Sequence, residues 1–126
     1  MNKIMLDTNF LVAPFQQGFD IFEEIERLYP ESKVYTLEDA VQEAKSIEEG
    51  RYVDLVEKLL ETKNIEVLET EGEGEVDDLL VEICDEFVVG TNDRELKERL
   101  LDEDAEVIIV RGGNHLEVRN RDSLRH

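Results

Sequence analysis

Short apolar runs alternate with amphipathic segments along the whole chain, and this alternation constrains the fold more than any other feature. The runs suit buried strands, whereas the segments between them repeat their apolar residues at helical spacing. Strands separated by helices are typical of a parallel sheet covered on both faces. We therefore predict an α/β three-layer sandwich with a five-stranded, mainly parallel sheet. The predicted strands are Lys3–Leu6, Lys33–Tyr35, Ile65–Leu68, Phe87–Val89 and Val107–Val110.

The amphipathic segments predict five helices. The stretch with Pro14 and Gly18 after the first strand is predicted as a loop, and so is Glu69–Glu75. Thr36 is the expected N-cap of the second helix. Gly112-Gly113 is expected to end the regular pattern. The predicted helices lie near Asp20–Leu28, Leu37–Glu48, Arg51–Lys63, Val76–Glu86 and Arg94–Leu101.

The composition fits one acidic domain. The 126 residues include 33 Asp and Glu against 14 Lys and Arg, for a formal net charge of -19. This balance argues against a generic nucleic-acid binder, because Lys and Arg supply most of the affinity for phosphate. A high-salt cytoplasm that screens the acids is one hypothesis, and ordinary acidity is the other. Residues 111–126 hold four arginines against two acids, which fits either a phosphate-contacting tail or a frayed terminus.

Several other classes of site are not indicated. The single cysteine, Cys84, excludes an internal disulfide and fits a reducing cytoplasm, and its helical apolar surroundings predict a core thiol. No apolar run is long enough for a membrane helix, and Asp7 interrupts any signal peptide. We expect a cytoplasmic protein with no membrane partner. Nucleotide-binding loops, a serine elbow and a zinc ligand set are all missing.

Acidic residues stand where predicted strands end or helices begin. Asp7 follows the first strand, Asp93 follows the fourth, and Asp77-Asp78 open a helix, while Glu43 lies beside a buried helical stripe. Each acid alone is explained as a cap or a solvated residue. The carboxyl ends of parallel strands, however, meet at one edge of a sheet. Clustered carboxylates repel by roughly 4 kcal/mol at about 4 Å and an effective dielectric of about 20, which favours a resident cation.

These residues resemble the PIN domain, a family of metal-dependent ribonucleases. The resemblance rests on four stretches and spans Ile4 to Val118, so we predict a PIN-like domain at 1–118 and a C-terminal tail at 119–126. More narrowly, Asp7-Thr8-Asn9-Phe10-Leu11 with Pro14, Gly18, Asp20 and Phe22 is similar to archaeal relatives of the small-subunit rRNA processing nuclease. The stretches are Leu6-Asp7-Thr8-Asn9, Glu43 after Thr36, Val76-Asp77-Asp78-Leu79-Leu80-Val81, and Val89-Gly90-Thr91-Asn92-Asp93-Arg94-Glu95-Leu96.

The resemblance implies roles for these residues. The implied catalytic acids are Asp7, Glu43, Asp77 and Asp93. The implied ligands of Mg²⁺ or Mn²⁺ are Asp7, Asp77 and Asp93, with Asp78 as the alternative to its neighbour; oxygen ligands suit these hard cations. The implied supporting polar groups are Thr8, Asn9, Thr91 and Asn92, and Arg94, Arg111 and Arg119 are candidate RNA contacts. After the last predicted strand, where relatives tend to be basic, this chain has Arg111-Gly112-Gly113-Asn114-His115 instead.

The leading prediction is an endoribonuclease of rRNA or other RNA processing. One or two Mg²⁺ or Mn²⁺ ions would bind the scissile phosphate and activate water, leaving a 5′-phosphate and a 3′-hydroxyl. Two alternatives stay open: a ribonuclease toxin with an antitoxin partner, and a PIN-like module that binds RNA or protein without cleaving. The expected partners are RNA and, depending on the alternative, a second copy, a pre-ribosome or an antitoxin.

Overall fold

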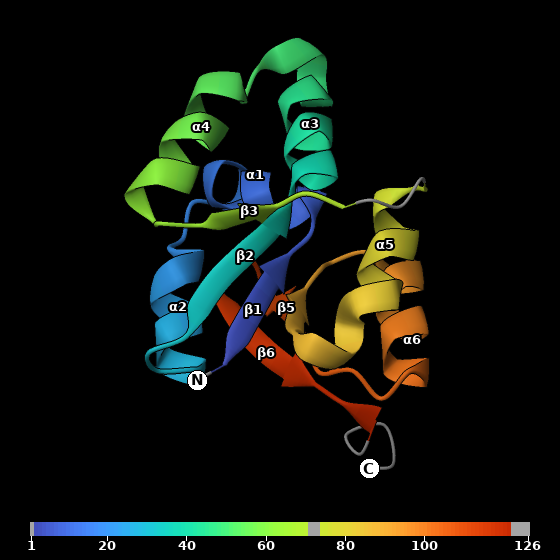
Figure 1. The fold of residues 1–126 in the computed structure, drawn as a ribbon. Coiled ribbons are helices and arrows are strands. Elements are labelled where there is room, and N and C mark those ends of the chain that lie inside the picture. The colour runs from blue at the N-terminus through green and yellow to red at the C-terminus, as the bar shows by residue number, and fades with distance from the viewer. Residues whose placement is uncertain (1, 71–73, 122–126) are drawn as a thin grey trace.

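The computed structural model describes residues 2–70 and 74–121, which form one sheet with helices packed around it (Figure 1). The sheet has six strands in the order β3-β2-β1-β4-β5-β6. The first five run parallel, and β6 pairs with β5 in the antiparallel sense. The predicted α/β class and mainly parallel sheet are confirmed, with one strand more than expected. The strands are β1 Lys3–Leu6, β2 Lys33–Leu37, β3 Glu66–Leu68, β4 Val88–Gly90, β5 Val107–Arg111 and β6 His115–Arg119.

The helices pack around this sheet in three places. Helices α5 and α6 pack against each other on one side, and α2 lies on the other side against β6 (Figure 1). Helix α3 packs against both α1 and α4 and rises beyond the carboxyl end of β2. The helices are α1 Thr8–Gln17, α2 Ile21–Leu28, α3 Glu38–Ser46, α4 Val53–Thr62, α5 Val76–Ile83 and α6 Arg94–Asp102, with 3-10 turns η1 Ile47–Gly50 and η2 Cys84–Glu86.

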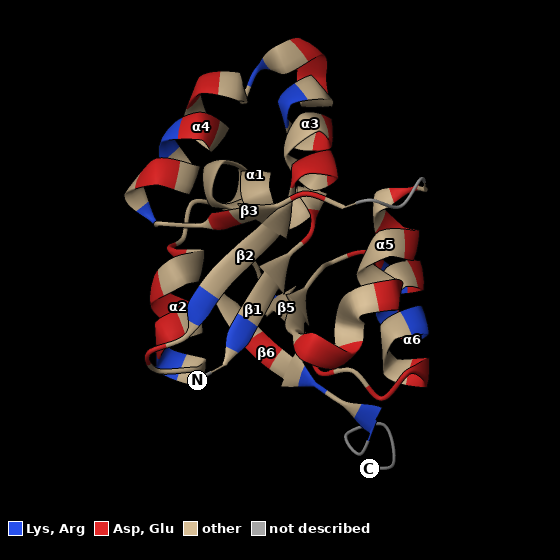
Figure 2. Ribbon diagram, viewed as in Figure 1, with Lys and Arg blue, Asp and Glu red and all other residues tan. Residues whose placement is uncertain are grey.

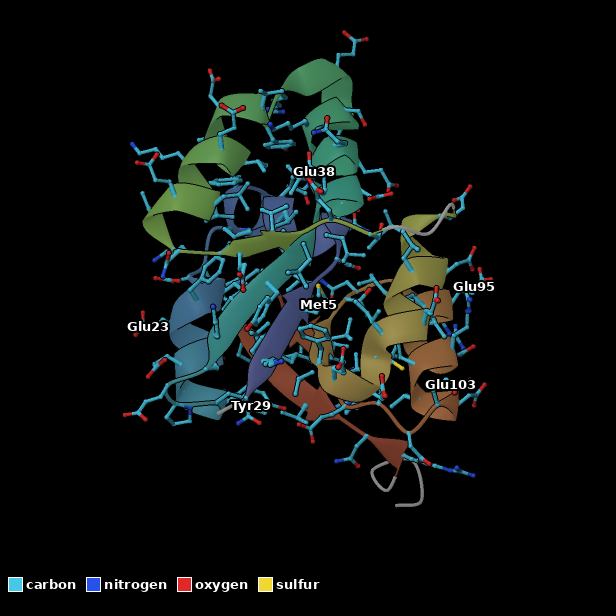
Figure 3. The ribbon with its side chains drawn as sticks, viewed as in Figure 1. Met5, Glu23, Tyr29, Glu38, Glu95 and Glu103 are labelled. Carbon is cyan, nitrogen blue, oxygen red and sulfur yellow. The ribbon has the colours of Figure 1, made fainter. Side chains whose placement is uncertain are left out.

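The core is mainly aliphatic and lies on both faces of the central strands. Strand β1 is fully buried from Ile4 to Leu6, as expected for a parallel strand covered on two sides. Met5 lies at the middle of the sheet, whereas Glu23 and Glu95 extend outward from α2 and α6 (Figure 3). Cys84 is buried, as predicted. None of the helices in residues 2–70 and 74–121 is both long enough and apolar enough to cross a membrane.

Helix α1 replaces the predicted loop after β1. Asp7 is its N-cap and accepts a hydrogen bond from the Phe10 amide at 2.9 Å, and Gly18 ends it in the left-handed conformation at φ 73°. Pro14 lies inside the helix, where proline removes one backbone hydrogen bond. Four consecutive buried residues, 10–13, offset this loss by packing into the core.

Gly90 lets α1 approach the sheet closely. A Cβ atom built at Gly90 would lie 2.9 Å from the Phe10 ring and 3.2 Å from the Leu6 side chain, closer than packed atoms allow. Only glycine therefore fits at the end of β4 while Phe10 keeps its position. This packing sets the separation between β4 and α1 at the end of β4, next to Thr91.

Two further predictions about local structure are corrected. Gly112 and Gly113, with φ of 63° and 71°, do not end the pattern but turn the chain into β6, which pairs Arg111 with His115. Thr36 is not a helix cap, because α3 follows β2 without a loop and Thr36 lies within the strand. Its hydroxyl instead donates to the Leu6 carbonyl at 2.9 Å. Residues 71–73 of the predicted loop and 122–126 of the predicted tail lie outside the described residues.

Candidate active site

The four predicted catalytic acids line one cavity of about 290 Å³ at the carboxyl edge of the sheet. Asp7 follows β1 and Asp93 follows β4, and these two strands are neighbours at the point where the strand order reverses direction. Open α/β sheets bind ligands at such a switch point. Helices α3 and α5 add Glu43 and Asp77 from either side. The complete lining is Asp7, Thr8, Asn9, Glu43, Ser46, Ile47, Glu75, Val76, Asp77 and Asp93.

Asp7 is the buried acid of the cavity lining, with 4% of its surface exposed. One carboxylate oxygen accepts from the Phe10 amide, and the other accepts a short hydrogen bond from the Thr91 hydroxyl. Burial raises the pKa of Asp7 from 3.8 to about 7; the two hydrogen bonds oppose this rise, and the charges of Asp77 and Asp93 add to it. A proton or a cation at Asp7 therefore relieves both desolvation and repulsion.

Thr91 joins the two acids that follow the strands. Its buried hydroxyl donates to Asp7 and accepts from the Asp93 amide at 3.0 Å. Asp93 in turn caps α6 by accepting from the Leu96 amide at 2.9 Å. Asn92 accepts from the Val110 amide at 2.8 Å and so fastens the same turn to β5. Each of these polar groups fixes the position of an acid or of the turn that carries it.

Asp77 and Glu43 are held less tightly than Asp7 and Asp93. Asp77 lies in the first turn of α5, and its pKa is raised by partial burial and then by the charges of Asp93 and Glu43, while Arg99 lowers it. Glu43 is exposed on α3 and accepts a hydrogen bond from the Thr8 hydroxyl at 3.3 Å. These two side chains can reorient toward a ligand without breaking a helix cap.

Asp78 does not join its neighbour in the cavity. Its carboxylate pairs with the Arg99 guanidinium at 2.9 Å, and 60% of the side chain is exposed. Successive residues of a helix point about 100° apart, so only one of the adjacent pair can face the site. The structure therefore brings Asp77, and not Asp78, together with the other acids.

The three candidate RNA contacts occupy different positions. Arg94 opens α6 next to Asp93 and pairs with Glu98 at 3.4 Å. Arg111 ends β5 at the same edge as the cavity. Arg119 lies opposite Val107, at the start of β5. The sheet does not bring Arg119 to the cavity, because β6 runs back toward the other edge.

Four of the lining residues were not predicted as site residues. They are Ser46, Ile47, Glu75 and Val76. Ser46 lies three residues after Glu43 and donates to its carbonyl at 2.7 Å, so helical spacing from the acid would have found it. Glu75 is the N-cap position of α5 and adds a fifth carboxylate to the cavity. Its proximity to Asp77 in sequence was the available signal.

The lining suits a hard divalent cation by its chemistry. Among the described lining residues all charged side chains are carboxylates, and no nitrogen or sulfur ligand is present. Burial raises the pKa values of Asp7 and Asp77, and the charges of neighbouring carboxylates raise them further. Within residues 2–70 and 74–121, however, no three His, Cys, Asp or Glu side chains already form a closed ligand group. The donor set fits the ion, and binding would draw the carboxylates together.

Comparison with known proteins identifies the family. The sequence profile of the PIN like domain matches residues 4–113. The chain belongs to this family. The PIN-like chain is 29% identical over 128 residues to Ribonuclease VapC4 of Methanocaldococcus jannaschii, and the match covers 94% of this chain and 97% of that protein.

Solved structures show the same fold. The PIN domain endonuclease Utp24 superposes with a TM-score of 0.80 at 22% identity, over 94% of this chain and 91% of that one. A domain of a functionally unknown protein from Methanocaldococcus jannaschii superposes with a TM-score of 0.64 at 17% identity, over 89% of this chain and 93% of that one. The predicted membership of the PIN family is confirmed, and the chain has the PIN domain nuclease fold.

Proposed function

We propose that this PIN-like domain is a divalent-metal-dependent endoribonuclease that hydrolyses RNA phosphodiester bonds. The observation that carries the proposal is the meeting of Asp7, Glu43, Asp77 and Asp93 in one cavity at the switch point of the sheet. These acids come from four separate elements, and the buried one has a pKa of about 7. The likeness to Ribonuclease VapC4 over 94% of the chain supports RNA as the substrate.

Asp7, Asp77 and Asp93 would hold Mg²⁺ or Mn²⁺, with Glu43 at the rim. When bound, the ion supplies Lewis-acid stabilisation of phosphate charge and lowers the pKa of water. Without positive charge the cavity repels the RNA phosphate, so its acids can act on RNA only in the loaded protein. Metal dependence is therefore part of the proposal and follows from the charge of the lining.

The protein's own contribution is to hold the acids in position. The Phe10 amide and the Thr91 hydroxyl fix both oxygens of Asp7. The Leu96 amide and the α6 N-terminus fix Asp93. Glu43 is exposed at the rim of the cavity, where its carboxylate can contact the substrate. Two acids are thus rigid and two adaptable, which suits an ion that must contact both protein and substrate.

The alternatives differ in partner and in outcome. Three alternatives remain predictions: processing of rRNA, action as a toxin with an antitoxin, and binding without cleavage. A homodimer, a pre-ribosomal partner and a cytoplasmic location remain predictions too. Copurification separates the first two: an antitoxin would copurify as a small protein, and a pre-ribosome as RNA-rich particles. The presence of all four acids in one cavity favours cleavage over binding alone.

The deciding experiment incubates the full chain with structured and single-stranded RNA in Mn²⁺, Mg²⁺ or EDTA. We expect endonucleolytic products with 5′-phosphate and 3′-hydroxyl ends in the presence of metal and none in EDTA. Cleavage that continues in EDTA would contradict the metal mechanism. Intact RNA under every condition would favour the non-cleaving alternative.

A further inference from the structure

The β5–β6 hairpin holds an anion of its own chain. The carboxylate of Glu117 receives the Arg111 Nε at 3.1 Å and the His115 Nε2 at 3.4 Å on one oxygen, and the Arg119 Nη1 at 3.4 Å on the other. We call Arg111, His115, Glu117 and Arg119 the hairpin cluster. Its basic members outnumber its single acid, in contrast to the rest of the chain.

The strand register places all four members on one face of the sheet. Arg111 pairs with His115, Glu117 lies opposite Ile109, and Arg119 lies opposite Val107. Alternate residues of a strand share a face, so positions 115, 117 and 119 point the same way. Arg111 and His115 remain 57% and 46% exposed, so both can contact a ligand without rearrangement of the strands.

The segment that carries this cluster is more basic than the rest of the chain. Acidic residues occur on every helix except α1 (Figure 2). Residues 111–121, by contrast, contain three arginines and one glutamate. The neighbouring acid on α2, Glu24, is already paired with Arg27 at 2.9 Å and accepts from the Leu116 amide at 3.0 Å. Burial alone would raise the pKa of Glu117, but the surrounding cations lower it below its usual value.

The cluster begins at the same edge of the sheet as the candidate cavity. Arg111 ends β5 at the carboxyl edge of the sheet, and the hydrogen bond from the Val110 amide to Asn92 joins this strand to the turn that carries Asp93. From there the cluster follows β6 toward the opposite edge. A strand of RNA at the cavity would therefore meet Arg111 first and Arg119 further along.

We propose that the hairpin cluster binds the phosphate backbone of the RNA strand, and that Glu117 occupies the position of a phosphate group until RNA replaces it. This inference rests on the proposed function for its ligand. Guanidinium groups bind carboxylate and phosphate through the same planar donors, so one anion can exchange for the other. When RNA binds, the Glu117 carboxylate turns to solvent. The phosphate oxygens then replace its oxygens as hydrogen-bond acceptors for the arginines.

The test measures binding of a fluorescein-labelled single-stranded RNA oligonucleotide to the full chain in EDTA, by anisotropy, between about 0.05 and 0.2 M KCl. The double variant Arg111→Gln with Arg119→Gln should bind several-fold more weakly. Its slope of log K against log[KCl] should fall in magnitude by roughly 0.7 for each phosphate that the variant no longer neutralises. The conservative pair Arg111→Lys with Arg119→Lys should keep most of the slope, because it keeps the charge.

Glu117→Gln gives the opposite expectation. Removal of the internal anion frees the cations, so this variant should bind the RNA several-fold more tightly than the parent. Glu66→Gln is the matched control for charge, because it breaks the Lys33–Glu66 pair at the far side of the sheet. Lys33→Gln with Arg51→Gln is the control for the double arginine variant, since both residues sit in surface ion pairs elsewhere.

The outcomes separate this inference from the nuclease proposal. Equal RNA binding by the parent and the double arginine variant would overturn the hairpin assignment, even if both cleave RNA in Mn²⁺. Absence of any RNA binding by the parent would overturn it as well. Tighter binding of a labelled polyglutamate peptide than of RNA would assign the cluster to an acidic protein. A parent that binds RNA through the cluster but cleaves nothing would instead contradict the proposed activity alone.

Discussion

The two edges of the sheet carry similar numbers of acids but treat them differently. At the amino edge, a cavity of about 580 Å³ is lined by five acids together with Lys3. There Glu106 accepts from the Tyr29 hydroxyl at 2.5 Å, and Asp104 pairs with Arg121 at 3.4 Å. At the carboxyl edge the smaller cavity is lined by carboxylates, and burial raises the pKa of Asp7. Neither cavity size nor acid count distinguishes the candidate active site from the amino-edge cavity. The distinguishing feature is a set of buried and partly buried carboxyls with raised pKa values.

The largest expected effect separates adjacent residues. Asp77→Asn should lower the rate of RNA cleavage about 100-fold or more, because loss of a charged ligand removes on the order of 3 kcal/mol of transition-state stabilisation. Asp78→Asn is the matched control, since its carboxylate pairs with Arg99 outside the cavity. Single-turnover cleavage measures both. Similar losses in the two variants would mean that the cavity does not define the ligand set.

Metal should stabilise the carboxyl edge and leave the amino edge unaffected. At about 100 times its dissociation constant a native-state ligand adds roughly 2.7 kcal/mol, which should raise the melting temperature of a domain of this size by several degrees. We expect this shift with Mn²⁺ or Mg²⁺ beyond an ionic-strength-matched KCl control. Asp7→Asn should show a much smaller shift, and Glu106→Gln the full one. Equal shifts in all three proteins would indicate general screening of the net charge.

The pH dependence of stability tests the buried carboxyl. Because the pKa of Asp7 is raised from 3.8 to about 7, the native state keeps a proton that the unfolded chain releases. The stability contributed by this protonation is complete below about pH 4 and is lost as the pH rises through about 7. In EDTA, the parent should therefore lose stability relative to Asp7→Asn between about pH 4 and 7. Urea unfolding of both proteins at several pH values measures the difference, and a constant difference would place Asp7 in solvent.

The smallest expected effect lies at the amino edge. Tyr29→Phe removes the hydrogen bond to Glu106 and should cost about 1 kcal/mol of unfolding free energy. Cleavage should be unchanged, because no element of the catalytic cavity is altered. A lower urea midpoint with parental activity would support a purely structural role for this edge. Loss of activity without loss of stability would show that the two edges are coupled.

The sequence predicted those parts of the fold in which local pattern and tertiary structure agree. Strands β1 and β4 are buried apolar runs, and Asp7 and Asp93 come at the turns that follow them, so the meeting of these two acids was predictable from topology alone. Helix α1 was not, because Pro14 argues for a loop, and the burial of the neighbouring side chains that offsets the proline is not visible in local propensity. Propensity cannot anticipate such packing.

The predictions of the last strand and of the choice between Asp77 and Asp78 fell short for other reasons. Strand β6 alternates apolar Leu116 and Val118 with charged residues, and a Gly-Gly turn precedes it, so its hairpin signal was present, but the two glycines were predicted to end the regular pattern. The assignment of Asp77 over Asp78 depends on the rotation of α5 against α6. That rotation is a property of the packed helices and is not encoded in the pair itself.

The caps formed by Asp7 and Asp93 have a consequence for the descent of such chains. Each of these acids also caps a helix, so a lineage that lost the proposed activity would still have a structural reason to keep a capping side chain at both positions. Among the helices of residues 2–70 and 74–121, none depends on the side chains of Asp77 or Glu43 for its cap. Inactive descendants should therefore lose those two first. If the proposed function is right, Asp7 and Asp93 in a newly sequenced relative would report the fold, whereas Asp77 and Glu43 would report whether the proposed chemistry is still in use.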